Sequence, residues 1–97
     1  FIGNNSAMAH FNFIGDSIIG GHVNFEAGAL IANHYNERLD KTIWAQVKGM
    51  RTNTGTFKFG ALIGDNSKIG ANAVLSPGTI LPKGSIVKRL ELIEQNN

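Results

Sequence analysis

The feature that most constrains this chain is a repeat of six residues. Its first position is apolar in two blocks, and the positions are Phe1, Ala7, Phe13, Ile19, Phe25 and Ile31, then Phe57, Ile63, Ile69, Leu75, Leu81 and Val87. A period of six fits neither an α-helix nor one alternating strand. It is typical of short strands wound into a coil, with one inward residue on each side.

The fourth position of the repeat is also restricted. It holds Asn4, His10, Asp16, His22, Gly28 and His34, then Gly60, Asn66, Asn72, Gly78 and Gly84. These residue types tolerate positive φ, which predicts a left-handed backbone at each corner between strands. The two columns together predict an all-β fold, a parallel β-helix of hexapeptide repeats. With three sides to a turn it has about four coils, and residues eighteen apart stack, as Phe13 over Ile31.

We expect one domain over residues 1–97, with coils at 1–36 and 57–87 and a protruding arm at 37–56. The arm alternates through Ile43, Ala45 and Val47 and has a turn signal at Lys48-Gly49, which predicts a hairpin. Trp44 either seals the arm against its own coil or packs on another subunit. Residues 88–97 form a C-terminal cap, as a last strand or a short helical plug. Because the chain begins inside a repeat, we expect a fragment of a longer protein.

Composition and charge argue against several classes of function. The formal charge of +2, with scattered Lys and Arg, does not favour nucleic acid binding. No apolar run is long enough to span a membrane and no signal peptide is present, so we expect a cytoplasmic protein. The chain has no Cys, which excludes a thiolate nucleophile or metal ligand. His10, His22 and His34 fall in different corner columns, so we expect no metal site of three His ligands within one subunit, although trimer symmetry could bring copies of one His together around an axis.

Several segments resemble a known family. They are M-A-H-F-N-F-I-G-D at 8–16, N-F-E-A-G-A-L-I-A-N at 24–33, and the arm with its return, including Val47–Gly49 and Lys58–Ala61. They are similar to the acetyltransferase half of the bifunctional sugar-1-phosphate nucleotidyltransferases of archaeal type. In that family GH-x-x-Y-x-GD precedes N-x-GAGT-x-x-x-N. Here Phe13 replaces the Tyr, and Glu26 and Ala29 replace a Gly and the Thr.

The resemblance implies a left-handed parallel β-helix that forms a homotrimer and binds acetyl-CoA along a groove between coils. It implies N-acetylation of an amino-sugar phosphate or nucleotide sugar, with no metal, and a nucleotidyltransferase domain outside this chain. His10 would be the catalytic general base. The substrate-binding candidates are Phe13, Asn24, Asn33 and Lys41, and the cofactor-binding candidates are Ala27, Ala71 and, by charge and location alone, Lys88.

Two other functions remain open. One is a non-catalytic trimerisation or regulatory coil attached to a sugar nucleotidyltransferase, because fold alone does not give function. The other is an acyltransferase with a different acceptor. The default role of His10 in either case is that of a corner residue.

Overall fold

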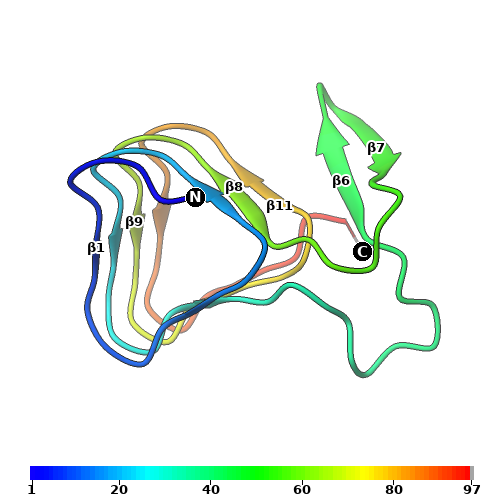
Figure 1. The fold of residues 1–97 in the computed structure, drawn as a ribbon, viewed down its shortest axis with the longest axis horizontal. Helices are drawn as coiled ribbons and strands as arrows, with labels where there is room; N and C mark the ends of the chain where they lie inside the picture. Colours follow the sequence, from blue (N-terminus) through cyan, green and yellow to red (C-terminus); the bar gives the residue numbers. More distant parts are fainter. Residues whose placement is uncertain (97) are drawn as a thin grey trace.

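Short β-strands make up the regular structure of the chain (Figure 1). The computed structural model describes residues 1–96, which form thirteen strands and no helix. Sheet 1 contains β1 (Ala7–Met8), β4 (Asn24–Phe25), β9 (Lys68–Ile69) and β12 (Ile86–Val87). Sheet 2 contains β2 (Phe13–Ile14), β5 (Leu30–Ile31), β10 (Val74–Leu75) and β13 (Leu92–Ile93). Sheet 3 contains β3 (Ile18–Ile19), β8 (Ala61–Ile63) and β11 (Thr79–Leu81).

The chain passes through the three sheets in a fixed order. Every third strand outside the arm returns to the same sheet and pairs in parallel with the strand laid down before it. Figure 1 shows these successive passes lying one behind another. The prediction of an all-β fold with a β-helix-like parallel arrangement is confirmed.

The core contains one column of inward residues from each sheet. Eight of the predicted inward residues are at most 8% exposed, namely Ile19, Phe25, Ile31, Ile63, Ile69, Leu75, Leu81 and Val87. Small residues, including Ala29 and Ala73, are buried between them. Each large side chain in these columns contributes about 1.5–3 kcal/mol of transfer free energy when it is buried. The regular spacing favours the wound fold because it brings such a side chain to the inside of each sheet.

The prediction is wrong in the first three repeats, where the phase is displaced by one residue. Phe1 is 83% and Phe13 is 52% exposed, and Ala7 is also exposed. Their following neighbours pair with core residues instead, and these pairs are Ile2 with Ile19, Met8 with Phe25, and Ile14 with Ile31. The residues that stack in this part are therefore seventeen apart, whereas later pairs, such as Leu75 with Ile93, are eighteen apart.

The cause is an ambiguity in side-chain chemistry. Each of the first three repeats has an apolar residue at both the predicted position and the next one, so hydrophobicity does not choose between them. In the second repeat the choice is between Ala7 and Met8, and only Met8 is long enough to fill the core. The phase is restored by one short repeat, because Asp16 turns the backbone only two residues after Ile14.

The same displacement changes the corners. Asn5 (φ 60°) and Phe11 (φ 53°) take the left-handed conformation predicted for Asn4 and His10. His34 and Gly60 do not adopt positive φ either, so those assignments are wrong as well. The other predicted corners are confirmed at Asp16, His22, Gly28, Asn66, Asn72, Gly78 and Gly84. His10 is thus not the left-handed residue of its corner.

The repeat resumes later than predicted after the arm. Phe57 was expected in the core but is 61% exposed. The chain rejoins the hydrogen-bonded ladder two residues later, where the Phe59 N–H donates to the Asn33 carbonyl (3.0 Å) and the Gly60 N–H donates to the Asp16 carbonyl (2.9 Å). A Cβ at Gly60 would collide with the Gly15 carbonyl and the Ser17 hydroxyl, so this re-entry requires glycine.

The arm is the predicted hairpin. β6 (Trp44–Val47) and β7 (Met50–Asn53) pair antiparallel and stand out to one side in Figure 1. The turn is at Lys48 and Gly49, both with positive φ, as a two-residue hairpin turn requires. The Arg51 guanidinium lies 4.0 Å from the centre of the Trp44 ring, so the half-buried Trp44 packs within its own hairpin. A contact of Trp44 with another subunit stays a prediction.

The chain after Val87 forms a strand, which is one of the two alternatives left open. β13 pairs with β10 in sheet 2, and the following Gln95 closes the edge of sheet 3. Its side-chain amide accepts from the Ile80 N–H (2.8 Å) and donates to the Ile80 carbonyl (2.9 Å). The Gln46 amide in turn donates to the Gln95 carbonyl (3.0 Å), which ties the arm to the tail.

Two glycines with nearly the same backbone conformation provide a test of how the arm docks. Gly78 (φ 85°) and Gly84 (φ 74°) both require positive φ, but a Cβ at Gly78 would collide with the Trp44 carbonyl, whereas nothing lies within 4 Å of one at Gly84. We expect Gly84→Ala to cost about 1–2 kcal/mol of folding free energy from backbone strain. Gly78→Ala should cost about 1–3 kcal/mol more from the collision. Urea denaturation of both variants measures the difference, and equal costs would contradict the docking.

Candidate functional site

His10 lies in a stack of four turns where sheet 1 passes to sheet 2. We call this stack the His10 corner, and its residues are His10–Phe11, Ala27–Gly28, Ala71–Asn72 and Arg89–Leu90. Backbone hydrogen bonds join each level of this stack to the next. The Gly28 N–H donates to the His10 carbonyl (2.8 Å), and the Asn72 N–H donates to the Ala27 carbonyl (3.0 Å). The Leu90 N–H donates to the Ala71 carbonyl (2.9 Å). The structure therefore aligns His10 with both alanine candidates for cofactor binding.

The His10 side chain is exposed at the N-terminal end of this stack. The centre of its ring lies 6.4 Å from the centre of the Phe11 ring, and the two ring planes are at an angle of 50°. In residues 1–96 the ring nitrogens of His10 make no hydrogen bond, so both remain accessible to a ligand. The residue beneath it in the stack is Ala27, whose small side chain leaves the approach along the corner open.

The outer face of sheet 1 holds two further candidates. Asn24 pairs with Lys68, and Lys68 pairs with Ile86, so their side chains lie in one row across the strands. Asn24 and Lys88 line the same open hollow, of about 440 Å³. This hollow leads to the His10 corner, because it is also lined by Arg89, which belongs to the corner, and by Glu26, which directly precedes the corner residue Ala27.

The charge of this hollow is positive. Lys68, Lys88 and Arg89 line it together with one carboxylate, that of Glu26. Two lysine ammonium groups and a guanidinium provide several donors for phosphate oxygens, and the guanidinium can bind two oxygens at once. The hollow is therefore suited to a small anionic ligand that carries an amide or hydroxyl group within reach of Asn24.

The remaining substrate candidates lie elsewhere. Phe13 is on the outer face of sheet 2, and Asn33 is at the opposite end of that sheet's strands from His10, where β5 leads to the arm. The Asn33 amide donates to the Asp16 carboxylate at 2.8 Å, and Gly15 leaves the space that this contact needs. Within one chain the structure does not bring Asn33 to the His10 corner, and Phe13, two residues after Phe11, lies on the outer face of sheet 2.

Lys41 lies in the loop that leads to the arm and is used to hold that loop. Its ammonium donates to the carbonyls of Tyr35, Asn36 and Arg38, each at 2.9 Å. These bonds use all three ammonium protons, which does not favour the predicted role in binding a sugar phosphate. The Lys41 assignment therefore rests on the resemblance alone.

The titratable groups beside Lys41 also serve the loop. Burial raises the pKa of Tyr35, and the nearby Arg38 guanidinium, 3.7 Å from the Tyr35 ring centre, partly opposes that rise. Hydrogen bonding from Thr42 lowers the pKa of Asp40, whose carboxylate accepts from the Thr42 N–H at 3.0 Å. These shifts belong to a turn that starts the arm, and neither group lines the hollow on sheet 1.

Sequence reasoning missed two residues of the site. Lys68 directly precedes the inward residue Ile69, just as Asn24 directly precedes Phe25. The repeat itself could therefore have identified Lys68 once the length of the arm was known. Phe11 is not singled out by the repeat, because the shift in phase at His10 is not visible in the sequence. Periodicity does not separate Met8 from Ala7, because both are apolar, so the repeat alone does not reveal that shift.

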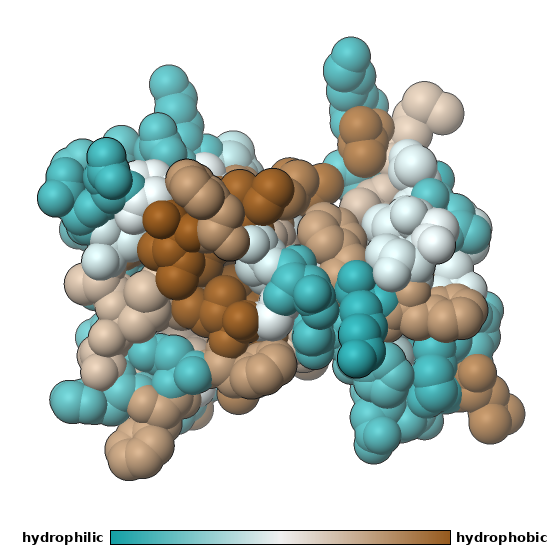
Figure 2. Space-filling model, viewed as in Figure 1, coloured by the Kyte–Doolittle hydropathy of each residue, from teal (hydrophilic) through white to brown (hydrophobic). Residues whose placement is uncertain are grey.

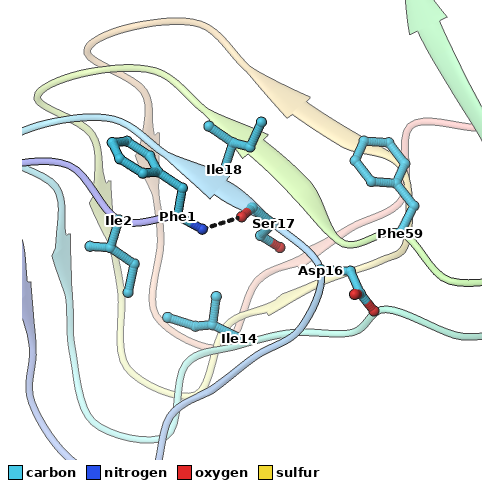
Figure 3. A pocket seen from close by; sticks show the side chains of 7 residues that line it. All are labelled: Phe1, Ile2, Ile14, Asp16, Ser17, Ile18 and Phe59. Carbon is cyan, nitrogen blue, oxygen red and sulfur yellow. Dashed lines mark hydrogen bonds between the residues drawn. The ribbon is translucent and has the colours of Figure 1, made fainter.

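A second hollow lies at the end of the coil where the N-terminus is found. It has a volume of about 450 Å³ and is lined mainly by apolar side chains, including Phe1, Ile2 and Ile14, with Asp16 and Ser17 at one side (Figure 3). Figure 2 shows apolar surface gathered over this end of the molecule. The Phe1 ammonium donates to the Ser17 carbonyl at 3.0 Å. None of the eight candidate residues lines this hollow, so we regard it as the exposed end of the core.

Comparison with known proteins does not extend the assignment. No protein-family model matches the chain, and no curated protein matches it. Residues 1–96 contain no helix of the length and apolarity needed to cross a membrane. The function is therefore argued from the His10 corner and the hollow beside it.

Proposed function

We propose that this domain is a left-handed, three-sided β-helix that transfers an acetyl group from acetyl-CoA to the amine of an amino-sugar phosphate or nucleotide sugar in the cytoplasm. His10 is the general base of the reaction. The active assembly is a homotrimer, and a nucleotidyltransferase domain precedes this domain in the full protein. The proposal extends the resemblance described above with the geometry of the His10 corner.

One observation supports the proposal most. His10 has no structural duty at the corner, since Phe11 supplies the left-handed backbone, and its ring is exposed above a column of alanines beside a cationic hollow. A histidine kept only as a corner residue would have positive φ, as His22 does (φ 57°). The His10 side chain is thus available for proton transfer, next to a surface suited to phosphate groups.

The chemistry follows from this placement. The acceptor nitrogen attacks the thioester carbonyl carbon, a C–N bond forms and the C–S bond breaks. The neutral His10 imidazole accepts the proton that the amine loses, and the departing CoA thiolate takes that proton from the imidazolium. Such proton transfer typically contributes about 10²–10⁴-fold to the rate. No redox partner or metal is needed to balance the reaction.

The other residues fall into two groups in this proposal. Asn24, Ala27, Ala71 and Lys88 act with His10 from the same chain, with the small alanines lining the path of the pantetheine and Lys88 binding phosphate. Asn33 is contributed by a neighbouring subunit, because within one chain it lies away from His10. Phe13 belongs to the apolar outer face of sheet 2 and makes subunit contacts rather than a polar contact to the sugar.

The test is an acetyl-transfer assay on the purified chain. We expect release of free CoA from acetyl-CoA when glucosamine 1-phosphate is present, and no release with glucose 1-phosphate, which lacks the amine. Calorimetric titration with CoA should show saturable binding. Absence of CoA binding at millimolar concentration, together with absence of transfer to either sugar, would refute the proposal.

A specific observation also favours the second candidate, a non-catalytic trimerising coil. The outward residues of sheet 2 are Phe13, Leu30, Val74 and Leu92, in register across four strands and all apolar. Phe13 is 52% and Leu92 is 56% exposed in the single chain. A contiguous apolar face of this kind marks an interaction surface. If sedimentation shows a trimer while the chain neither binds CoA nor transfers acetyl groups, this second function holds instead.

A further inference from the structure

The His10 corner has bulky residues at two levels where small ones are expected. Four residues occupy its left-handed position, and they are Phe11 (φ 53°), Gly28 (φ 77°), Asn72 (φ 57°) and Leu90 (φ 65°). Glycine and asparagine are ordinary at such an angle, whereas phenylalanine and leucine are uncommon there. Strained backbone of this kind is found preferentially at functional sites, and it persists where the surrounding structure holds the conformation in place.

Burial does not explain Phe11. Its side chain is 93% exposed, so in residues 1–96 it adds almost nothing to the core in return for its backbone strain. The ring of the preceding residue, His10, has its centre 6.4 Å from that of Phe11, and the two rings are tilted by 50°. The two exposed rings therefore lie next to each other at the N-terminal end of the His10 corner, and an acceptor that presents its amine to His10 comes close to Phe11.

We propose that Phe11 is the apolar platform on which the sugar ring of the acceptor packs while its amine faces His10. This inference rests on the proposed function. A pyranose ring has an apolar face of C–H groups, and an exposed aromatic ring offers a rigid apolar surface that loses little conformational entropy on contact. The acceptor is then held by two kinds of contact, namely its amine by His10 and its ring face by Phe11.

Leu90 supplies a matched comparison. It has the same backbone conformation and is 74% exposed, but it lies three strand spacings along the corner from Phe11. Neighbouring strands are about 4.8 Å apart, so the two side chains are separated by about 14 Å. A single sugar ring in contact with Phe11 does not reach Leu90.

The experiment compares Phe11→Asn with Leu90→Asn. Asparagine already occupies this position at Asn72, so both variants keep a residue that tolerates the backbone angle. We expect Phe11→Asn to raise the KM for glucosamine 1-phosphate by about 10-fold, the effect of removing one apolar contact to a substrate. The KM for acetyl-CoA should change less than twofold, and Phe11→Tyr should restore the acceptor KM. Leu90→Asn should leave both KM values unchanged.

Binding measurements separate this inference from the proposed function. Calorimetry with glucosamine 1-phosphate is done on wild type, Phe11→Asn and His10→Ala. Weaker binding by Phe11→Asn in a protein that transfers no acetyl group would support the platform and refute the acetyltransferase. An unchanged acceptor KM and affinity in Phe11→Asn, or no acceptor binding by wild type, would overturn the platform. So would dissociation of the trimer by Phe11→Asn, since Phe11 would then be a subunit contact.

Discussion

Replacing His10 with alanine is expected to lower kcat for acetyl transfer by at least about 100-fold. The reason is that alanine cannot accept the amine proton, while the backbone of the His10 corner does not depend on the His10 side chain. The ladder at this position uses the His10 carbonyl, which accepts from the Gly28 N–H, and alanine retains that carbonyl. Steady-state kinetics with acetyl-CoA and glucosamine 1-phosphate measures the loss, and sedimentation should show an unchanged assembly.

His22→Asn is the matched control for this variant. His22 is also an exposed histidine of the repeat, but it is a true corner residue with φ 57° at a different turn, where its N–H donates to the Asn4 carbonyl (2.8 Å). Asparagine tolerates the same angle, so kcat should stay within about twofold of wild type, since surface changes of this kind have small effects. Equal losses in both variants would show that His10 acts through folding, and full activity in His10→Ala would exclude it as the base.

The second prediction tests the phase of the repeat by comparing the loss of stability in two variants, each with one phenylalanine replaced by alanine. Phe25 is fully buried, while Phe13, twelve residues earlier in the six-residue pattern, is 52% exposed. Phe25→Ala should lower the free energy of unfolding by about 3–5 kcal/mol through lost burial and a cavity. For a chain of this size each kcal/mol corresponds to a fall of about 4–8 °C in Tm.

Phe13→Ala should behave differently. Its side chain points out from sheet 2, so its effect on the single chain is expected to stay below about 1 kcal/mol. If the outer face of sheet 2 packs between subunits, the effect of Phe13→Ala will grow with protein concentration, whereas that of Phe25→Ala is present at any concentration. Thermal unfolding at several concentrations separates the two. Similar losses in both variants at the lowest concentration would mean that the first repeats keep the uniform six-residue phase.

The repeat made most of the fold predictable, because two independent constraints act on each hexad. An inward residue must be apolar, and a corner residue must tolerate positive φ. Ile69 satisfies the first constraint and Asn72 the second, and neither has a neighbour in sequence that satisfies the same constraint equally well. Both are placed as predicted. The first repeats offered two apolar residues in succession, so the choice depended on which side chain fills the core. That choice is made by packing volume, which periodicity does not contain.

The candidate site was less predictable for the same reason. The displacement of one residue moved the left-handed angle from His10 to Phe11, and thereby changed His10 from a corner residue to an available side chain. The grouping of Asn24 with Lys88 depends on strands far apart in sequence, since the arm separates β4 from β9. The hydrogen bonds of Lys41 to three carbonyls depend on a loop that has no periodic pattern at all.

The side chain of Gln95 has a consequence for how these molecules behave at high concentration. β11 is the last strand of sheet 3, and an exposed last strand invites pairing with other chains. The carboxamide at Gln95 engages both the N–H and the C=O of Ile80, which are the groups that an incoming chain would need. A carboxylate there could accept from the N–H but would repel the carbonyl oxygen. One neutral side chain thus occupies the two backbone groups of Ile80 with which an added strand would pair.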